Sequence, residues 1–358
     1  MESMRLPRIL KNLLLLVSFI FLTLVALEIG FRIFKPQQNF TAVIDTWDED
    51  LGLKNIPKGS GRLRTPEFDI RAAINSKGLR DREYEYAKPE QTRRILCLGG
   101  SFTFGYGVEV NETFAKVLEN LLNEGRVGDC SWEILNGGLC GSGTAHQLAH
   151  LCAEGFRYDP DLIVVSFAGD NDFSDNAMCG LYTVEDGKLV RHKARLSMPV
   201  RLRRVMQRLP GYRLLFGRSH LLTFVKHRIA RWAYAYHRSK DRSPAKVEAG
   251  RRRAYELTAS VFAAIQDSCA RRGCNLLVII LPEFGQAPHP ERVTDLMDFF
   301  KSHGITYIDL EPAFSAEKEQ GIQNYFPVDG HWNPHGHRLT ARILYDAIAA
   351  GAWTPSDP

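Results

Sequence analysis

The sequence predicts an α/β protein, a three-layer α/β/α sandwich around a five-stranded parallel sheet, with an N-terminal transmembrane helix. Three observations lead to this fold class. Five short apolar segments alternate with amphipathic helical segments between residues 93 and 351, which is typical of a parallel sheet covered by helices. The third of these segments, residues 161–169, is almost continuously apolar, as expected of a strand buried on both faces. Residues 13–27 form an apolar run without a charge.

The length of 358 residues accommodates one large α/β domain with additional segments. A hydrophobic content of 44% and a charged content of 24% are ordinary for a globular protein. The formal net charge of +5 is unevenly distributed. Twenty Lys and Arg residues lie between Lys188 and Arg253, where Asp241 and Glu248 are the only acidic residues. One segment is therefore strongly basic, and the rest of the chain is acidic on balance.

The N-terminal apolar run, extended to residue 34, approaches the roughly 20 residues needed to span a bilayer. No convincing signal-peptide cleavage site follows it, so residues 1–34 are expected to be a cytoplasmic tip and an uncleaved signal anchor. Arg5, Arg8 and Lys11 precede the run, and the acidic stretch 45–50 follows it. The positive-inside rule then predicts a cytoplasmic N-terminus and an extracytoplasmic main domain, which is periplasmic in a Gram-negative cell.

Residues 35–91 have little periodicity and are expected to be a stalk and entry segment. The catalytic domain is expected over residues 92–351. Its strands and helices are assigned from apolar periodicity. In chain order, they are a strand at 93–100, a helix at 112–125, a strand at 132–138, a helix at 144–156, strands at 161–169 and 275–282, a helix at 290–304, a strand at 305–310 and a helix at 337–351.

Residues 174–250 interrupt this alternation and form a predicted insertion after the third strand. Residues 180–192 resemble a β hairpin with Asp186-Gly187 as its turn. Basic and aromatic residues follow, and apolar residues recur at helical spacing from Leu221 to Trp232. Two interpretations stay open: a helical hairpin packed on the domain, or a lid that binds an anionic membrane surface or an acidic polymer. Nucleic acid is a disfavoured partner for an exported domain.

Polar loops follow the first three strands, and a fourth precedes the last helix. They are "GGSFTFG" with Ser101, "NGGLCGSGT" with Gly141, "GDND" with Asn171, and "PVDGHWNPHGH" with Asp329 and His331. Each loop alone is compatible with an ordinary turn or helix cap. Ligands of parallel sheets bind beyond the carboxyl ends of the strands. Four polar loops in these positions therefore indicate an active site.

Three rival motifs fail against the first loop. A phosphate-binding P-loop requires Gly-Lys-Ser/Thr, but no lysine occurs between residues 94 and 111. A dinucleotide-binding G-x-G-x-x-G would need a third glycine after Gly105 and Gly107. The G-x-S-x-G turn of α/β-hydrolases would need a glycine where Thr103 stands.

Acyl-transfer chemistry remains. Ser101 is the candidate nucleophile, His331 the base that removes its proton, and Asp329 the carboxylate that orients the imidazole. Backbone amides at Ser101 and Gly141, with the side-chain amide of Asn171, are the candidate oxyanion hole. His335 and His337 are alternative bases, but both fall where the last helix begins.

The order Ser, Gly, Asn, Asp-His resembles the SGNH (GDSL) hydrolase superfamily from Arg93 to about Gly351. The resemblance implies a flavodoxin-like α/β/α fold and a serine esterase or acyltransferase that needs no cofactor. No metal-type Cys-x-x-Cys spacing occurs in the sequence, so no structural zinc is expected. Gly100 stands where the family usually has Asp, and Asp329-x-His331 is one residue shorter than the usual Asp-x-x-His. The shorter spacing, followed by Trp-Asn, resembles membrane-linked SGNH proteins that O-acetylate exopolysaccharides.

The resulting hypothesis is an extracytoplasmic, membrane-anchored enzyme acting on acyl esters of carbohydrate. Hydrolase and transferase stay open as alternatives, because both form the same acyl-enzyme. A catalytically silent carbohydrate-binding or assembly protein on the same fold is the alternative from another class.

Overall fold

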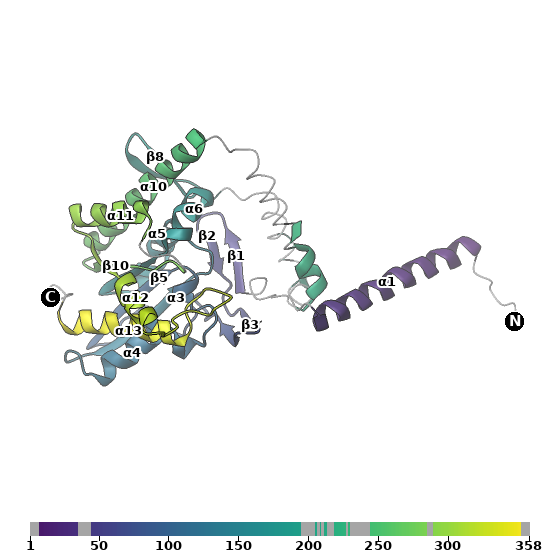
Figure 1. Cartoon of the computed structure of the whole chain (residues 1–358), viewed down its shortest axis with the longest axis horizontal. Coiled ribbons are helices and arrows are strands. Elements are labelled where there is room, and N and C mark those ends of the chain that lie inside the picture. Colours follow the sequence, from purple (N-terminus) through teal and green to yellow (C-terminus); the bar gives the residue numbers. More distant parts are fainter. Residues whose placement is uncertain are drawn as a thin grey trace.

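A five-stranded parallel sheet forms the centre of the domain (Figure 1). The computed structural model describes residues 7–34, 44–194, 205, 208, 211–212, 218–226, 228–229, 244–284 and 289–351. The strand order is β11-β10-β7-β5-β6, and every neighbouring pair is parallel. This confirms the predicted sheet. The strands are β5 (Thr92–Gly99), β6 (Ser131–Gly138), β7 (Leu162–Phe167), β10 (Asn275–Ile280) and β11 (Thr306–Asp309).

Helices cover both faces of the sheet, as predicted. Alternate residues of one strand point to opposite faces, so Leu96 and Leu98 of β5 belong to one apolar cluster, and Ile95 and Cys97 belong to another. The first cluster contains residues of α5 (Thr144–Ala153), α6 (Gly169–Cys179), α10 (Pro244–Arg271) and α11 (Glu291–Ser302). The second contains residues of α4 (Phe114–Glu124), α12 (Glu311–Glu319) and α13 (Pro334–Ala349). Shorter helices lie at α3 (Ser101–Phe104), η1 (Val110–Glu112) and η2 (Gly155–Tyr158).

The expected entry segment contains two antiparallel hairpins, to which the sequence pattern assigned no strands. They consist of β1 (Asp45–Asp48) with β2 (Gly52–Asn55), and β3 (Ser60–Arg64) with β4 (Asp69–Ala73). A third apolar cluster joins the second hairpin to the domain, since Leu63, Phe68 and Ile70 pack with Phe104 and Phe326. The strands are only four or five residues long, too short for periodicity to stand out.

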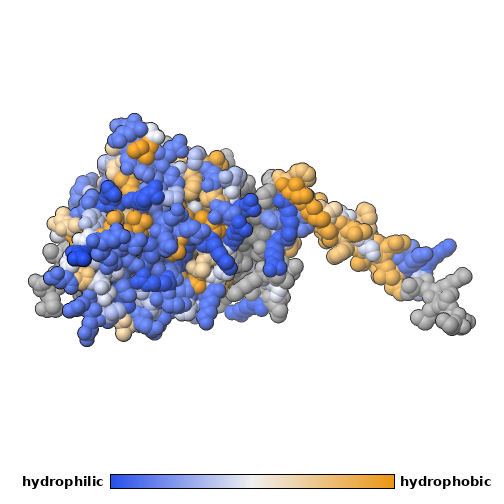
Figure 2. Space-filling view, turned by 90° about the horizontal axis from the view of Figure 1, so that it is seen from below, coloured by the Kyte–Doolittle hydropathy of each residue, from blue (hydrophilic) through white to orange (hydrophobic). Residues whose placement is uncertain are grey.

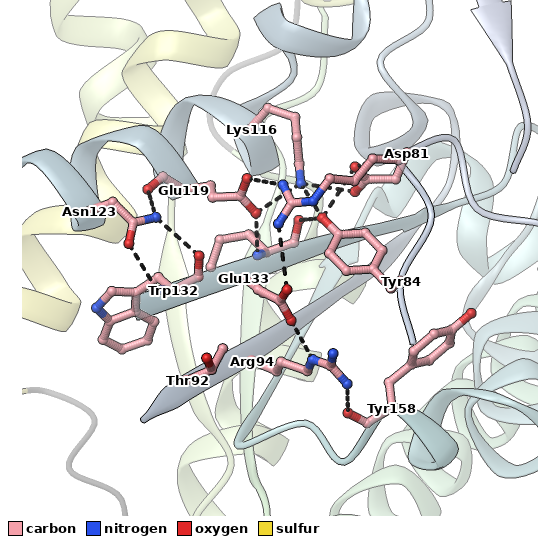
Figure 3. Close-up of polar contacts among 12 residues, drawn as sticks. Asp81, Tyr84, Thr92, Arg94, Lys116, Glu119, Asn123, Trp132, Glu133 and Tyr158 are labelled. Atoms are coloured by element: carbon pink, nitrogen blue, oxygen red, sulfur yellow. Dashed lines mark hydrogen bonds and ion pairs between the residues drawn. The ribbon is translucent and has the colours of Figure 1, made fainter. Parts of the chain in front are cut away.

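A network of ion pairs also joins the entry segment to the sheet (Figure 3). The ammonium of Lys116 on α4 lies 3.0 Å from both Asp81 and Glu119 and donates to the hydroxyl of Tyr84 at 2.7 Å. Asp81 also accepts a hydrogen bond from the amide of Asn136, near the carboxyl end of β6 (2.9 Å). Buried charges are tolerated when each is paired and hydrogen-bonded. The network therefore fixes residues 81–84 against the strand that leads to the second polar loop.

Helix α1 (Arg8–Phe34) projects away from the domain (Figure 1). It is 27 residues long, and an 18-residue window within it has a mean hydropathy of 2.6, with none of that window buried. Figure 2 shows it as a largely hydrophobic rod beside a mostly hydrophilic domain. The helix is thus long and apolar enough to cross a membrane.

The predicted hairpin of the insertion is confirmed. Strands β8 (Tyr182–Glu185) and β9 (Lys188–Arg191) pair antiparallel, and Asp186 and Gly187 both have positive φ, of 48° and 73°. This pair of positive φ values suits a tight two-residue hairpin turn. Residues 220–226 and 228–229 are helical. Trp232 and the arginines at 201, 203 and 204 lie outside the described residues.

The end of α1 contacts this helical part of the insertion. The carboxylate of Glu28 accepts hydrogen bonds from the Ser219 hydroxyl and from the amides of residues 220 and 221, at 2.8–3.0 Å. These amides are at a helix N-terminus, where unpaired N–H groups favour a carboxylate. The rings of Phe31 and Phe224 lie beside this cap, with centroids 4.6 Å apart. The apolar helix and the insertion are therefore joined through specific contacts.

Candidate active site

Ser101 lies at the centre of the carboxyl edge of the sheet. It follows β5 through Gly100, and β5 lies between β6 and β7 in the sheet. Gly141 follows β6, and Asn171 lies in the first turn of α6, which follows β7. The three loops thus come from three adjacent strands, with the loop of Ser101 in the middle.

Close packing fixes the backbone around Ser101. A side chain at Gly138 would place its Cβ only 2.1 Å from the backbone nitrogen of Phe104, so glycine is required for α3 to lie against β6. The carbonyl of Ser101 accepts hydrogen bonds from the amides of Gly105 and Tyr106, both at 3.0 Å. Since α3 is a single turn, these contacts, rather than a long helix, hold Ser101.

The Asp-x-His loop is a tight turn. The amide of Phe326 donates to the carbonyl of His331 (2.8 Å), and the amide of Gly330 donates to the carbonyl of Phe326 (2.9 Å). Gly330 has a φ of +83°, which side chains other than glycine rarely adopt. Trp332 is fully buried beneath the turn, and Asn333 caps α13 by accepting hydrogen bonds from the amides of residues 335 and 336. The Trp-Asn pair thus anchors the loop to the domain.

Two hydrogen bonds connect Ser101, His331 and Asp329. The Nε2 atom of His331 lies 2.7 Å from the Oγ of Ser101, and its Nδ1 lies 2.5 Å from Oδ1 of Asp329. The side chains of His331 and Asp329 are 25% and 19% exposed, so the chain of bonds is partly shielded yet accessible. In this geometry His331 can accept the Ser101 proton while Asp329 holds the opposite nitrogen protonated.

Aromatic rings surround the imidazole of His331. The ring of Tyr106 lies 4.6 Å from it between centroids, and that of Phe102 lies 5.1 Å from it. Burial raises the pKa of Tyr106, and the nearby Asp329 adds to the shift. The phenol is therefore neutral at ordinary pH. The two rings limit the orientation of the imidazole and add no charge to the site.

The two alternative histidines have other partners. His335 lies 3.0 Å from a carboxylate oxygen of Glu317. His337 is almost fully buried, and its Nδ1 accepts a hydrogen bond from the amide of Phe114 at 3.2 Å. Of these histidines, it is His331 that makes the hydrogen bond to Ser101.

The candidate oxyanion donors are available. Within the described residues, the structure gives no acceptor for the backbone amides of Ser101 and Gly141 or for the side-chain amide of Asn171. Gly141 and Asn171 are both exposed. The neighbouring Asp172 is buried instead and accepts from the amide of Ala168 at 3.1 Å. Burial raises its pKa well above the usual range, and Asp172 therefore has a structural role at the start of α6.

Glu67 is a site residue that the sequence analysis missed. Its two carboxylate oxygens accept hydrogen bonds from the amides of Val328 (2.9 Å) and Asp329 (2.8 Å). The adjacent Phe68 contacts the ring of Tyr106, with centroids 5.9 Å apart. The β3–β4 hairpin thus supports both the Asp-x-His loop and a ring beside His331. Glu67 is 262 positions from Asp329, and no sequence motif marks it.

The described residues contain no group of three or more His, Cys, Asp or Glu side chains that could hold a metal ion.

Comparisons with known proteins bear on the family. The model of the "SGNH hydrolase-like domain, acetyltransferase AlgX" matches residues 236–357, which include the Asp-x-His loop. Among curated proteins, none matches.

Solved structures with a similar arrangement include three that share little sequence with this chain. A two-domain esterase (CEX) active on acetylated mannans is 12% identical with a TM-score of 0.42; the match covers 74% of this chain and 52%, about half, of that one. The acetyl xylan esterase AlAXEase is 10% identical with a TM-score of 0.41, covering 71% of this chain and 99% of that one. A putative GDSL-like lipase from Parabacteroides merdae is 12% identical with a TM-score of 0.41, covering 72% and 95%.

The family match falls on the half of the domain that carries β10, β11 and the Asp-x-His loop. The remaining polar loops follow β5, β6 and β7 in the order that the superfamily shows. Residues 236–357 thus match the SGNH hydrolase-like domain, and the five-stranded α/β/α sandwich is the fold that the resemblance to this superfamily implied.

Proposed function

We propose that this protein is a membrane-anchored serine esterase or O-acyltransferase that acts on acyl esters of carbohydrate, principally acetyl esters. The observation that carries the proposal is the pair of hydrogen bonds joining Ser101, His331 and Asp329, at 2.7 and 2.5 Å. Serine alone is a weak nucleophile, and an adjacent base oriented by a carboxylate is the usual means of activating it.

In the first step, His331 Nε2 takes the proton of Ser101 while Oγ forms a bond to the acyl carbon. The carbonyl oxygen becomes negatively charged, and the amides of Ser101 and Gly141 and the side chain of Asn171 donate hydrogen bonds to it. The carbonyl then re-forms, and the bond to the alcohol oxygen breaks. The imidazolium of His331 returns its proton to that oxygen, which leaves an acyl-serine and a free hydroxyl.

In the second step, a hydroxyl group attacks the acyl-serine. His331 takes its proton, the new oxygen–carbon bond forms, and Ser101 leaves and recovers the proton. Water as the attacking group gives hydrolysis, and a sugar hydroxyl gives acyl transfer. The description of the matched family as an acetyltransferase and the shortened Asp-x-His spacing support an acetyl group and a carbohydrate.

The membrane part of the proposal rests on α1. Arg8 and Lys11 lie at its N-terminal end, and the acidic stretch from Asp45 to Asp50 follows it, which favours a cytoplasmic N-terminus and an extracytoplasmic domain. The helical part of the insertion contacts the end of α1 and exposes three apolar side chains at helical spacing, Leu222, Val225 and Ile229. We propose that this part of the insertion lies on the membrane surface, where its basic residues contact anionic headgroups.

A fluorophosphonate probe tests the catalytic part directly. Stoichiometric labelling of Ser101, located by peptide mapping and absent from Ser101→Ala, is the expected result. Labelling distinguishes an enzyme from a carbohydrate-binding protein with the same fold, because only an activated serine reacts. A folded protein that is not labelled would contradict the proposal and favour the binding protein.

A further inference from the structure

A cavity of about 310 Å³ lies at the carboxyl ends of β10 and β11. Residues 282–284, which follow β10, form one side of it, and Glu311, which follows β11, is on another. The segment from Gln323 to Tyr325 closes a third side. The volume is at the lower end of the range for small-molecule pockets, and parallel sheets bind ligands at this edge.

The cavity shares its wall with the catalytic loop. Tyr325, which lines the cavity, forms a β bridge with Trp332, so the lining segment runs antiparallel to the residues next to His331. On the other side, the ring of Phe284 lies 3.3 Å from where a Cβ of Gly330 would be. Gly330 stands between Asp329 and His331. A ligand in the cavity would therefore lie against the segment that carries Asp329 and His331.

The lining combines apolar rings with hydrogen-bonding groups. Phe284 is 47% exposed and packs edge-on against Tyr325, with centroids 5.3 Å apart. Asn324 is only 3% exposed, and its Oδ1 has no hydrogen-bond partner within the described part of the chain. An unpaired buried acceptor is unfavourable, and a ligand hydroxyl that reached this oxygen would satisfy it.

The charges around the cavity indicate a neutral ligand. Lys318 is basic, while Glu283 and Glu311 are acidic, so both signs are present and the small acidic excess disfavours an anionic ligand. A sugar ring is neutral, has apolar C–H faces that stack on aromatic rings, and carries hydroxyl donors around its edge. A plain acyl chain would fill the apolar part but leave the acceptor on Asn324 unsatisfied.

We propose that this cavity is a subsite for one neutral sugar unit of the carbohydrate, with Phe284 as its stacking platform and Asn324 as a hydroxyl acceptor. This inference rests on the proposed function and deepens it, since it names the place from which a sugar hydroxyl reaches the acyl-enzyme. In that step the hydroxyl proton passes to His331, the sugar oxygen bonds to the acyl carbon, and Ser101 leaves with the returned proton.

Binding of ester-free disaccharides to the full-length Ser101→Ala protein in detergent tests the subsite without requiring catalysis. Mannobiose, cellobiose and xylobiose are the probes, measured by saturation-transfer NMR and by titration calorimetry. We expect saturable binding of at least one disaccharide and a tenfold or greater rise in its Kd in Phe284→Ala and in Asn324→Ala. Phe284→Tyr should retain binding. Val247→Ala, which removes an exposed apolar side chain from α10, is the matched control and should not change Kd.

Two results would overturn the subsite. One is the absence of saturable binding by all three disaccharides. The other is that octanoate binds and depends on Phe284 while no disaccharide competes with it, because the cavity would then be an acyl site. Failure of the catalytic proposal looks different: Ser101 would not react with the fluorophosphonate, yet the disaccharide would still bind in a manner that depends on Phe284 and Asn324.

Discussion

One ring nitrogen of His331 is hydrogen-bonded to Ser101 and the other to Asp329. The neighbouring His335 and His337 form hydrogen bonds with other residues. We therefore predict that Ser101→Ala and His331→Ala each abolish hydrolysis of p-nitrophenyl acetate, since each removes a group that acts in the same step. Both side chains are small or partly exposed, so circular dichroism and the Tm should stay close to those of the parent protein.

His335→Ala is the matched control, because its partner is Glu317 and its turnover should stay near the parent value. Asn171→Ala should lower the rate by a factor on the order of 10²–10³, as loss of one oxyanion donor does. A severe loss in His335→Ala with normal rates in His331→Ala would show that His331 is not the base.

His337 makes stability depend on pH. Burial lowers the pKa of His337 from 6.5 to about 3, and Arg80 contributes to the shift. Between these values the unfolded chain binds a proton that the folded protein does not, so the stability present above about pH 6.5 is lost as the pH falls toward 3. We predict that the Tm decreases from pH 7 to pH 4. The titration of His337 lowers the free energy of unfolding by up to ~1.4 kcal/mol per pH unit in this range.

The variant His337→Asn tests the assignment of this effect. It removes the titrating group while keeping an acceptor for the Phe114 amide. The Tm at pH 7 should be lower, but its decline toward pH 4 should be shallower. The buried His146, whose pKa burial lowers to about 4, shifts stability in the same sense, so some decline should persist. An unaltered slope in His337→Asn would contradict the prediction.

At the scale of elements, the β3–β4 hairpin holds the catalytic loop through Glu67. Its carboxylate binds the amides of Val328 and Asp329, so Glu67→Ala should let Asp329 move relative to His331. We predict a fall in kcat of roughly tenfold to a hundredfold, because small displacements of reacting groups are costly. The KM for p-nitrophenyl acetate and the Tm should change little, since Glu67 contacts neither the triad imidazole nor the core of the sheet.

Arg64→Ala is the control for this hairpin, because Arg64 is an exposed residue of β3 that pairs with Asp69 at 3.5 Å. It should leave kcat unaltered. If Glu67→Ala lowers the Tm and kcat in parallel, or has no effect on kcat, Glu67 is not a positioning residue.

The insertion is the element that we expect to contact lipid. Deletion of residues 1–34 should leave a domain that still binds anionic vesicles at low salt, because basic residues contribute about 1 kcal/mol each near such a surface. Reversal of four basic residues to Glu should remove this binding and spare turnover of a small soluble ester. The four residues are Arg201, Arg203, Arg204 and Arg208. Co-sedimentation with vesicles of phosphatidylglycerol, at increasing salt, measures the effect.

Neutral phosphatidylcholine vesicles are the control for this experiment and should not bind the truncated domain. If the truncated domain does not bind anionic vesicles at low ionic strength, the insertion has only a structural role in packing against the rest of the protein.

At the scale of the whole molecule, α1 is expected to cross the membrane, with the N-terminus in the cytoplasm and the domain on the opposite side. A phosphatase that folds only outside the cytoplasm, fused after residue 358, should be active in a Gram-negative host, because the positive residues before α1 are retained inside. Fusion of a reporter active only in the cytoplasm, at the same position, is the control and should be silent. The opposite pair of results would reverse the orientation.

The sequence by itself determined the fold class. Strand and helix periodicity are local properties, so the five parallel strands and the covering helices α4, α5, α11 and α13 could be predicted. The hairpin at Asp186-Gly187 follows from a two-residue signal. The short strands before residue 74 and the helices α6, α10 and α12 were not assigned from the sequence pattern. Ser101, Gly141, Asn171, Asp329 and His331 could be named from local motifs and their order, and their catalytic roles stay a prediction.

Only the tertiary structure decided which distant groups meet. Ser101 and His331 are 230 positions apart, and the choice among three histidines depends on which imidazole the Trp332–Asn333 anchor directs toward Ser101. The role of Glu67 and the cavity beside Phe284 could not be predicted from the sequence, because each depends on contacts between segments that share no sequence pattern. Local chemistry specifies strands and loops, but distances across a sheet edge arise only when packing brings the loops together.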